Sequence, residues 1–255
     1  MIPNIIHFVF GLKPQTEEFL FGYYLAVYSS YLVNQPEKIY FYYHHVPFGK
    51  WWEKLKKIPV LTLEKVPIPT HFGKKPILQV AHKADKVRMD KLMERGGVYM
   101  DIDTISVRPY HQLLQHQVVL GKQIHHVGIC NAIMFSEPNS DFFRIWMENY
   151  EKEFKSDGWN ESSIDLPYKL AQRYPELLEV KEAEWFFKPS FWQVHHIFEL
   201  EINIPSELIT LHLWEKFSIC YLKKINGWEW AEMNKHTLYG KIMNHLLDKY
   251  HISKE

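Results

Sequence analysis

The stretch "GGVYMDIDT", residues 96–104, decides the predicted fold because it runs from an apolar segment into two aspartates one residue apart. In an extended strand alternate side chains share a face, so Asp101 and Asp103 are predicted to project together while Ile102 turns inward. Two adjacent carboxylates repel each other, and a shared proton or a divalent cation relieves that repulsion. Oxygen-rich sites with open positions suit Mg²⁺ or Mn²⁺. The stretch therefore predicts either a proton-sharing pair or a metal site at the exit of a strand.

Strand-like and helix-like patterns alternate on both sides of this stretch. Short runs rich in β-branched and aromatic residues predict strands, and segments with helical apolar periodicity lie between them. The "ERGG" at 94–97 gives the preceding helix a glycine stop. Such alternation predicts an α/β fold with a mainly parallel central sheet flanked by helices. The predicted strands are residues 5–10, 39–43, 60–63, 98–102, 118–120, 129–135 and 208–213, and the clearest predicted helices are residues 17–33, 78–95, 141–154, 163–174 and 237–250.

The chain shows no internal repeat, no low-complexity segment and no linker that would divide it, so one domain is predicted. Its 255 residues are enough to bury a substantial core. The proline-containing segment 66–76 is interpreted as a surface loop. In open α/β sheets ligands bind outside the carboxyl ends of the strands, which is where Asp101 and Asp103 are predicted to lie.

Charge and apolar patterning exclude several classes of protein. The 30 basic and 30 acidic residues cancel, so no global attraction to nucleic acid or to an anionic membrane is expected. The apolar segment 19–33 is shorter than the ~20 residues that span a bilayer, so no transmembrane segment is predicted. The N-terminal "MIPNIIHFVFG" lacks a basic leader and is interpreted as a strand. Cys130 and Cys220 form no CxxC pair and indicate buried thiols in a reducing compartment. A cytoplasmic protein of a bacterium, or of a virus in its host cytosol, is expected.

The two aspartates need structural context, because a chance D-x-D is common in a chain of this composition. The helical segment "AHKADKVRMDKLMERGG" leads directly into the strand, and Asp85 and Arg88 lie three residues apart on its surface. A fixed anion and a fixed cation are therefore predicted close to the acidic pair, although an ordinary ion pair is the alternative. The aromatic content of 16% can serve stacking on bases and sugars, but the core is the preferred location for most rings.

These residues resemble the DXD sugar-binding region of glycosyltransferases. The chain is similar to glycosyltransferase family 32, which includes fungal initiating mannosyltransferases and bacterial capsule enzymes, and to the glucosylating domain of the large clostridial toxins. Three more segments match the family in its order: "IPNIIHFVFG" at 2–11, "ICNAIMFSEP" at 129–138 and "LHLWEKFS" at 211–218. Four ordered matches are more specific than any one of them. The central pattern A-x-x-x-D-x-x-R, G-G-x-Y-x-D-x-D corresponds here to Ala81, Asp85, Arg88, Gly96, Gly97, Tyr99, Asp101 and Asp103.

The resemblance implies a GT-A-like single domain over residues 1–255. The nucleotide-sugar-binding part would be about residues 1–125, and the acceptor-side and C-terminal part about 126–255. The implied enzyme moves a hexose from a nucleoside diphosphate sugar, a UDP- or GDP-sugar, to a glycan or other hydroxyl acceptor. A divalent cation, Mn²⁺ or Mg²⁺, would neutralise the departing diphosphate as a Lewis acid.

By resemblance, Asp103 would ligate the metal directly, and Asp101 would contact the ribose and the metal, partly through water. His212 would be a third metal ligand, and its nitrogen favours Mn²⁺ over Mg²⁺. Lys216 or Ser218 would lie near the diphosphate. A satisfied buried histidine is the alternative interpretation of His212.

The resemblance also implies residues for the donor sugar and the base. Asp85 and Arg88 would hold hydroxyls of the sugar, and such buried polar contacts discriminate strongly between sugars. Asn131 would lie near the reacting carbon and act with Asp101 and Asp103 in catalysis, while Trp214 would cover the diphosphate. Phe10 stands where the family usually has a tryptophan near the base, so it can stack but leaves the base unidentified. Plain packing is the alternative for the asparagine and the tryptophan.

Retention of anomeric configuration is implied by the family. Double displacement would need a carboxylate nucleophile, and none is identified. Front-face attack, in which the leaving phosphate helps to deprotonate the acceptor, is therefore preferred. A haloacid-dehalogenase-like phosphatase is the rival enzyme, with Asp101 as nucleophile and Asp103 as general acid, but its downstream acidic pair is missing. A non-catalytic sugar-binding module is the other alternative.

Overall fold

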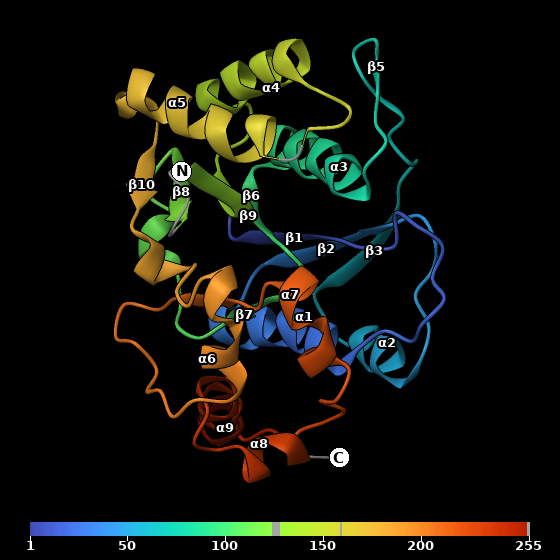
Figure 1. Ribbon diagram of the computed structural model, residues 1–255, viewed down its shortest axis with the longest axis vertical. Helices are drawn as coiled ribbons and strands as arrows, with labels where there is room; N and C mark the ends of the chain where they lie inside the picture. Colours follow the sequence, from blue (N-terminus) through green and yellow to red (C-terminus); the bar gives the residue numbers. More distant parts are fainter. Residues whose placement is uncertain (124–127, 159, 254–255) are drawn as a thin grey trace.

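A seven-stranded sheet forms the centre of the molecule, in the order β10-β8-β9-β6-β1-β2-β3 (Figure 1). The computed structural model describes residues 1–123, 128–158 and 160–253. Strand β9 runs antiparallel to both of its neighbours, and the other pairings in this sheet are parallel. The predicted mainly parallel α/β sheet is thus confirmed. The strands are β1 (Ile5–Val9), β2 (Lys38–Tyr43), β3 (Leu61–Lys65), β6 (Gly97–Met100), β8 (Val118–Gln123), β9 (Gly128–Ser136) and β10 (Glu179–Lys181).

Helices cover both faces of this sheet (Figure 1). One layer holds α3 (Val80–Arg95), α4 (Asp141–Glu153) and α5 (Leu166–Arg173). The opposite layer holds α1 (Phe21–Asn34), α2 (Lys50–Leu55) and the C-terminal helices, in line with two buried hydrophobic clusters that lie on the two sides of the sheet. The remaining elements are β4 (His71–Phe72), β5 (Lys75–Pro76), β7 (Thr104–Ser106), β11 (Thr210–His212), α6 (Val194–Phe198), α7 (Glu215–Leu222), α8 (Glu229–Met233) and α9 (Leu238–Tyr250).

Burial on two sides explains why the central strands are continuous apolar runs. In β6, Val98 and Met100 belong to the cluster beneath α1, whereas Tyr99 belongs to the cluster beneath α3. Alternate side chains of one strand point to opposite faces, so each face of β6 receives apolar groups. The strand begins at Gly97, where φ is +101° and a Cβ atom would lie 2.6 Å from the carbonyl oxygen of Ile5. Glycine therefore permits this close approach of β6 to β1.

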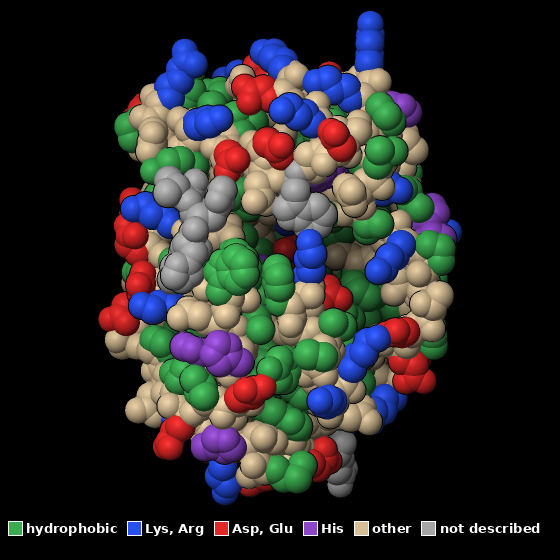
Figure 2. Space-filling view, viewed as in Figure 1, with side chains coloured by type: hydrophobic (Ala, Val, Ile, Leu, Met, Phe, Trp, Pro, Cys, Tyr) green, Lys and Arg blue, Asp and Glu red, His purple; other side chains and the backbone are tan. Residues whose placement is uncertain are grey.

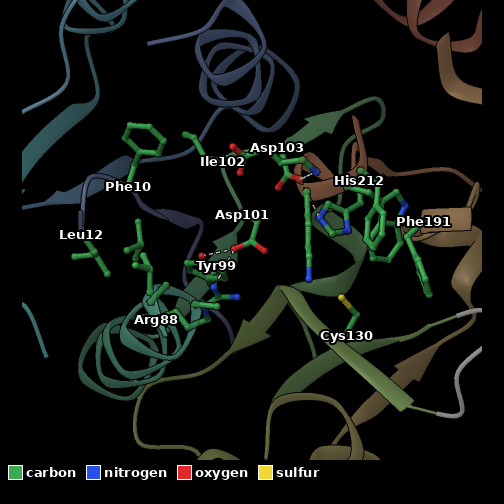
Figure 3. A pocket seen from close by; sticks show the side chains of 18 of the residues that line it. Phe10, Leu12, Arg88, Tyr99, Asp101, Ile102, Asp103, Cys130, Phe191 and His212 are labelled. Carbon is green, nitrogen blue, oxygen red and sulfur yellow. Dashed lines mark hydrogen bonds and ion pairs between the residues drawn. The ribbon is translucent and has the colours of Figure 1, made fainter. Parts of the chain in front are cut away.

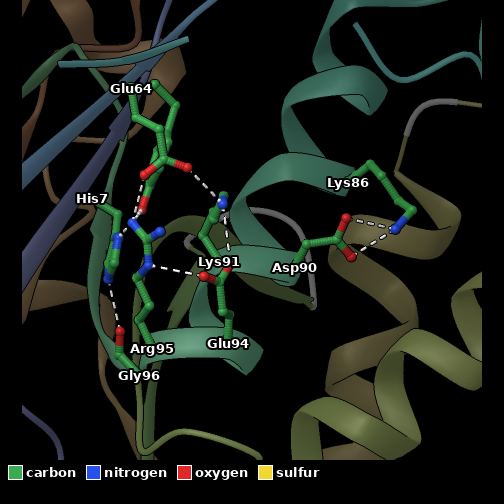
Figure 4. A network of polar contacts seen from close by, with 9 residues as sticks. His7, Glu64, Lys86, Asp90, Lys91, Glu94, Arg95 and Gly96 are labelled. Atoms are coloured by element: carbon green, nitrogen blue, oxygen red, sulfur yellow. Dashed lines mark hydrogen bonds and ion pairs between the residues drawn. The ribbon is translucent and has the colours of Figure 1, made fainter. Parts of the chain in front are cut away.

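A paired polar network also holds the start of β6 next to β1 (Figure 4). The buried His7 contacts the Gly96 carbonyl through Nε2 at 2.7 Å and the Tyr42 hydroxyl through Nδ1 at 2.9 Å. Because a carbonyl can only accept, Nε2 carries the proton and Nδ1 accepts from the tyrosine. Burial lowers the pKa of His7 to about 4, which keeps the ring neutral. The network thus ties β1 and β2 to the turn that precedes β6.

The structure corrects the predicted strand through residue 102. Strand β6 ends at Met100, and residues 101–103 form a turn in which the backbone N–H and hydroxyl of Thr104 donate to the Asp101 carbonyl at 3.1 and 2.7 Å. The chain leaves the central sheet here because β7 pairs with β11 in a separate two-stranded sheet. Strand alternation therefore does not orient Asp101 and Asp103; the turn does.

Other predicted boundaries also shift. The first helix begins at Phe21, not at residue 17, because the N–H of Phe19 donates to the carbonyl of Phe48 in a neighbouring loop. The segment 163–174 is a π turn, Glu161–Asp165, followed by α5. The predicted loop 66–76 contains the short β4–β5 hairpin. Both cysteines are free thiols, but Cys220 is exposed on α7, so its predicted burial is wrong.

The helices in the described ranges are all too short or too polar to cross a bilayer. The cytoplasmic location stays a prediction.

Candidate active site

A cavity of about 740 Å³ opens beyond the carboxyl ends of β1 and β6. Figure 2 shows the molecule hollowed near the middle of one face, with acidic side chains visible inside the hollow. Its wall comes from segments far apart in the sequence, including residues 9–13 at the end of β1, the turn 101–103, α3 and the start of α7. This is the edge of the sheet at which ligands were expected.

Asp101, Asp103 and His212 gather on the wall of this cavity (Figure 3). One ligand atom from each residue lies within 4.8 Å of the others. His212 is the residue opposite Thr104 in the β7–β11 ladder, so that pairing sets its distance from the turn. Its Nε2 lies 3.3 Å from Oδ2 of Asp103. The structure thus brings together the three residues predicted to hold the metal.

The two carboxylates have different surroundings. The Tyr99 hydroxyl donates to Oδ1 of Asp101 at 2.5 Å, and an Arg88 nitrogen lies 3.2 Å from the same oxygen. Burial nevertheless raises the pKa of Asp101, against the attraction of Arg88 and with added repulsion from Asp103. Burial also opposes ionisation of Asp103, but His212 and the N–H of Glu215, at 2.6 Å, hold the pKa of that carboxyl below its ordinary value. The two pKa values shift in opposite directions, as expected for neighbouring carboxylates that repel each other, and a cation would relieve that repulsion.

The donor set fits a divalent cation. Nε2 of His212 is the ring nitrogen that faces the acidic pair, 3.3 Å from Oδ2 of Asp103, so it is the nitrogen placed to bind a cation together with the two carboxylates. Nδ1 of the same ring is buried with no hydrogen-bond partner among the described residues. Two carboxylates and one imidazole suit Mn²⁺, and Mg²⁺ less well.

Arg88 is the predicted sugar-binding residue that reaches the cavity, and Asp85 stands behind it. The guanidinium lies over the Tyr99 ring at 4.4 Å and donates to the Asn131 carbonyl at 2.9 Å. The Asp85 carboxylate accepts from the Tyr150 hydroxyl at 2.7 Å and from the Asn131 amide at 2.8 Å. Asp85 and Asn131 are not among the residues of the cavity wall. The structure thus places both behind the arginine, and their predicted contacts with the donor sugar stay predictions.

Trp214 and Lys216, the residues predicted beside the diphosphate, line the cavity at the start of α7. Trp214 has a left-handed backbone with φ of +56°, which is rare for a bulky residue and common at functional sites. This conformation starts α7 so that the N–H of Glu215 reaches Asp103. Ser218 is fully buried behind them and does not line the cavity. Phe10 does line it, on the β1 side.

Sequence reasoning missed Glu215, a third carboxylate of the cavity wall. It accepts a hydrogen bond of 2.5 Å from the Tyr23 hydroxyl, which comes from the start of α1. Burial raises the pKa of Glu215, and repulsion from Asp103 raises it further. Its position directly after Trp214, a predicted site residue, was the sequence signal that could have identified it. Nothing in the sequence linked it to Tyr23, because 192 residues separate the two.

Comparisons with known proteins agree with this geometry. Residues 23–120 match the family model described as a glycosyltransferase sugar-binding region containing a DXD motif. Glucan organizing enzyme 1 of Cryptococcus neoformans is 33% identical over 250 residues, which cover 89% of this chain and 66% of that protein. Human alpha-1,4-N-acetylglucosaminyltransferase is 24% identical over 146 residues, 51% of this chain and 42% of that protein. The chain thus spans just under two thirds of one relative and less than half of the other.

Two solved structures share the fold. The apo form of the glycosyltransferase GlyE of Streptococcus pneumoniae aligns with a TM-score of 0.53 at 16% identity, covering 97% of this chain and 64% of that chain. The galactosyltransferase LgtC, in complex with donor and acceptor sugar analogues, aligns with a TM-score of 0.50 at 12% identity, covering 82% and 86%. These likenesses confirm the predicted GT-A architecture. The chain therefore carries, over residues 23–120, the DXD sugar-binding region of glycosyltransferases.

Proposed function

We propose that the chain transfers a hexose from a nucleoside diphosphate sugar to a hydroxyl group of a glycan, with Mn²⁺ or Mg²⁺ bound by Asp101, Asp103 and His212. One observation carries the proposal: three metal-type ligand atoms lie within 4.8 Å of one another on the wall of a cavity of about 740 Å³. That volume lies within the range of small-molecule binding sites. The family match favours this activity over the phosphatase and the sugar-binding module.

The protein side chains hold the acidic pair in place for the cation. Asp103 is fixed by the Glu215 N–H, and Asp101 by Tyr99 and Arg88. When bound, the cation supplies Lewis-acid stabilisation of the departing diphosphate. Preorganised charges of this kind are usually the largest contribution to catalysis, because they need no rearrangement during the reaction.

Phe10 is the proposed platform for the base. Its ring packs edge-on against Phe19 and lies 5.2 Å from the Tyr23 ring, so its orientation is fixed before the nucleotide binds. Aromatic rings stack on any base, which is consistent with a UDP- or a GDP-sugar. Figure 3 shows Phe10 on one side of the acidic pair, with Arg88 below it. The donor would then place its base near Phe10 and its diphosphate near Asp103 and Lys216.

Arg88 is the proposed contact for the donor sugar. Nη1 donates to the Asn131 carbonyl and Nη2 faces Asp101, so the remaining N–H groups would bind the sugar hydroxyls, while Asp85, Asn131 and Tyr99 hold the guanidinium in one orientation. The names of both curated relatives refer to carbohydrates, a glucan in one and N-acetylglucosamine in the other, and this supports a glycan as acceptor. Retention by front-face attack stays part of the proposal, with the protein positioning and neutralising the reactants.

A ligand screen tests the proposal before any acceptor is identified. The melting temperature is measured with UDP-glucose, UDP-galactose, UDP-N-acetylglucosamine and GDP-mannose, each with Mn²⁺, Mg²⁺ or EDTA. A ligand that binds only the native state raises the melting temperature, so at least one donor should stabilise the protein in a metal-dependent way. Asp103→Asn should remove that shift. Stabilisation that is equal with EDTA would contradict the metal assignment, and no stabilisation by any donor would contradict the function.

A further inference from the structure

Three aromatic side chains form a connected surface at the edge of the cavity, on the side away from Phe10. Phe191 and Phe217 line the cavity, and their ring centroids lie 5.3 Å apart. Trp192 adjoins Phe191 at 4.8 Å and extends the surface outward. Trp192 is 68% exposed and Phe217 is 46% exposed. Figure 2 shows hydrophobic side chains gathered beside the hollow on this face. Exposed apolar patches of this kind commonly mark binding sites.

The backbone beneath Trp192 is held firmly. Residues Phe191–Gln193 form a single 3-10 turn, and the N–H and hydroxyl of Ser190 both donate to the Gln193 side chain at 3.3 Å. The indole N–H of Trp214 donates to the carbonyl of Pro189 at 2.9 Å, which attaches this segment to the cavity wall. The Trp192 ring packs against Phe191 on this backbone, so less conformational entropy is lost when a ligand stacks on it than on a mobile loop.

The shape of the surface favours a sugar ring. The Phe191 ring is tilted by 36° to Trp192 and by 33° to Phe217, so the three ring faces are only moderately inclined to one another. A pyranose has a flat face of C–H groups that can lie on such rings while its hydroxyls stay in water. Neutral rings also impose no charge requirement on the ligand.

The surface is placed where an acceptor must enter. Phe191 lies 5.7 Å from the Trp214 ring, and Trp214 lies 4.1 Å from the His212 ring. Two aromatic contacts thus connect the surface to the metal-binding cluster. In Figure 3, Phe10 and Phe191 lie on opposite sides of Asp101 and Asp103. A donor whose base stacks on Phe10 would leave the opposite side open for the molecule that receives the sugar.

We infer that Phe191, Trp192 and Phe217 form the acceptor subsite, which binds a pyranose ring of a neutral glycan by stacking. The assignment rests on the proposed function. It extends that function by naming the residues that bind the acceptor and by requiring that the acceptor present a sugar face next to its reacting hydroxyl.

The test compares sugar transfer with donor hydrolysis, which needs no acceptor. The intact protein receives UDP-glucose, UDP-N-acetylglucosamine or GDP-mannose with Mn²⁺, and β-glucan, chitin and mannan oligosaccharides serve as acceptor probes. We expect Trp192→Ala to lower the ratio of transfer to hydrolysis about tenfold through a higher acceptor KM, because one stacking ring is lost. Trp192→Tyr should restore most of the ratio. The control is Met233→Ala on α8, an exposed apolar residue that does not line the cavity and should leave the ratio unchanged.

Saturation-transfer NMR with the same oligosaccharides, without any donor, reports stacking directly. Signals on sugar C–H protons that weaken in Trp192→Ala support the subsite. An unchanged ratio in Trp192→Ala, or an equal loss of transfer and hydrolysis, would overturn it. Wild-type protein that hydrolyses a donor but neither binds nor glycosylates any oligosaccharide would also overturn it and indicate a non-carbohydrate acceptor. Failure of the proposed function is a different result, because it shows as no nucleotide-sugar binding at all.

Discussion

Helix α3 contributes to two charged clusters that differ in how completely their charges are paired. At its C-terminal end, Lys91 and Arg95 both contact the Glu64 carboxylate, at 2.8 and 2.7 Å (Figure 4). One turn earlier, Arg88 faces Asp85 at 3.5 Å and Asp101 at 3.2 Å. The first cluster is balanced by residues of the chain. The cluster around Arg88 holds more acidic than basic side chains, because Asp103 and Glu215 also belong to it.

The pKa shifts express the same difference. Burial opposes ionisation of Glu64, but hydrogen bonds from Lys91 and Arg95 overcome it and lower the pKa of that carboxyl. In the cavity, burial raises the pKa of Asp101 and of Glu215, and repulsion from Asp103 adds to both. A structural cluster is satisfied by the protein itself, whereas a site that awaits a cation holds like charges together. Substitutions in the two clusters should therefore have different effects.

The largest effect is expected from Asp103→Asn. The amide keeps the shape of the side chain but removes the negative charge next to His212 and the Glu215 N–H. Sugar transfer should fall about 10³-fold, roughly 4 kcal/mol of transition-state stabilisation. The melting temperature without ligand should stay within a few degrees of the wild type. Activity that persists at more than a tenth of the wild-type value would remove Asp103 from the metal site.

The second effect concerns His7 in the paired network. Its folded pKa of about 4 lies below the ordinary value of 6.5, so the unfolded state binds the proton more readily. Stability should therefore fall as the pH drops from 6.5 to about 4, by about 3 kcal/mol from this group. Urea unfolding at several pH values measures the slope. In His7→Gln the slope over this window should be clearly shallower, and an identical slope would contradict the role of the histidine.

A smaller effect is expected from Glu64→Gln. The folded pKa of Glu64 is lowered, so its contribution to stability is present above pH 4.5 and is lost as the pH falls through the folded value. At neutral pH the substitution should lower the free energy of unfolding by about 1 kcal/mol. Asp90→Asn is the matched control, because the Lys86–Asp90 pair is more exposed and should contribute little. Equal losses in the two variants would show that Glu64 is no more than a surface ion pair.

The smallest effect is expected from Glu215→Gln. Removing one of three carboxylates should weaken Mn²⁺ binding about threefold, because the remaining ligands keep most of the charge attraction. Tyr23→Phe keeps the charge and deletes the hydrogen bond to Glu215, so it should change the metal affinity less. Isothermal titration with Mn²⁺ distinguishes them. A greater loss in Tyr23→Phe than in Glu215→Gln would mean that orientation, not charge, is the contribution of this pair.

The sheet was predictable because strands buried on both faces are continuous apolar runs. Strand β6 shows this, since Val98 and Met100 enter one cluster and Tyr99 enters the other, and in β9 Met134 and Phe135 likewise enter different clusters. The turn at residues 101–103 was not predictable, because it depends on the β7–β11 pairing between segments about a hundred residues apart. The alternation of apolar and polar residues in the sequence gave no sign of this turn.

The candidate site was predictable in part. The motif pattern grouped Asp101, Asp103, His212 and Arg88, and the structure brings these four to one cavity. It gave no way to distinguish residues of the wall from those behind it. Asp85 is buried behind the wall and accepts a hydrogen bond from Tyr150, and its predicted contact with the sugar stays a prediction. The residues behind the cavity wall, like the aromatic surface at Trp192, depend on how helices and loops pack. A short sequence motif carries no information about that packing.

Mn²⁺ titration of the protein, with and without UDP or GDP, tests the central claim most directly. We predict one bound Mn²⁺ whose affinity rises in the presence of nucleotide, with a loss of at least about 100-fold in Asp103→Asn and in His212→Ala, because each removes one of three ligands. Glu64→Gln should bind Mn²⁺ as the wild type does. Equal Mn²⁺ binding by wild type and Asp103→Asn, or nucleotide binding that is indifferent to the metal, would contradict the account.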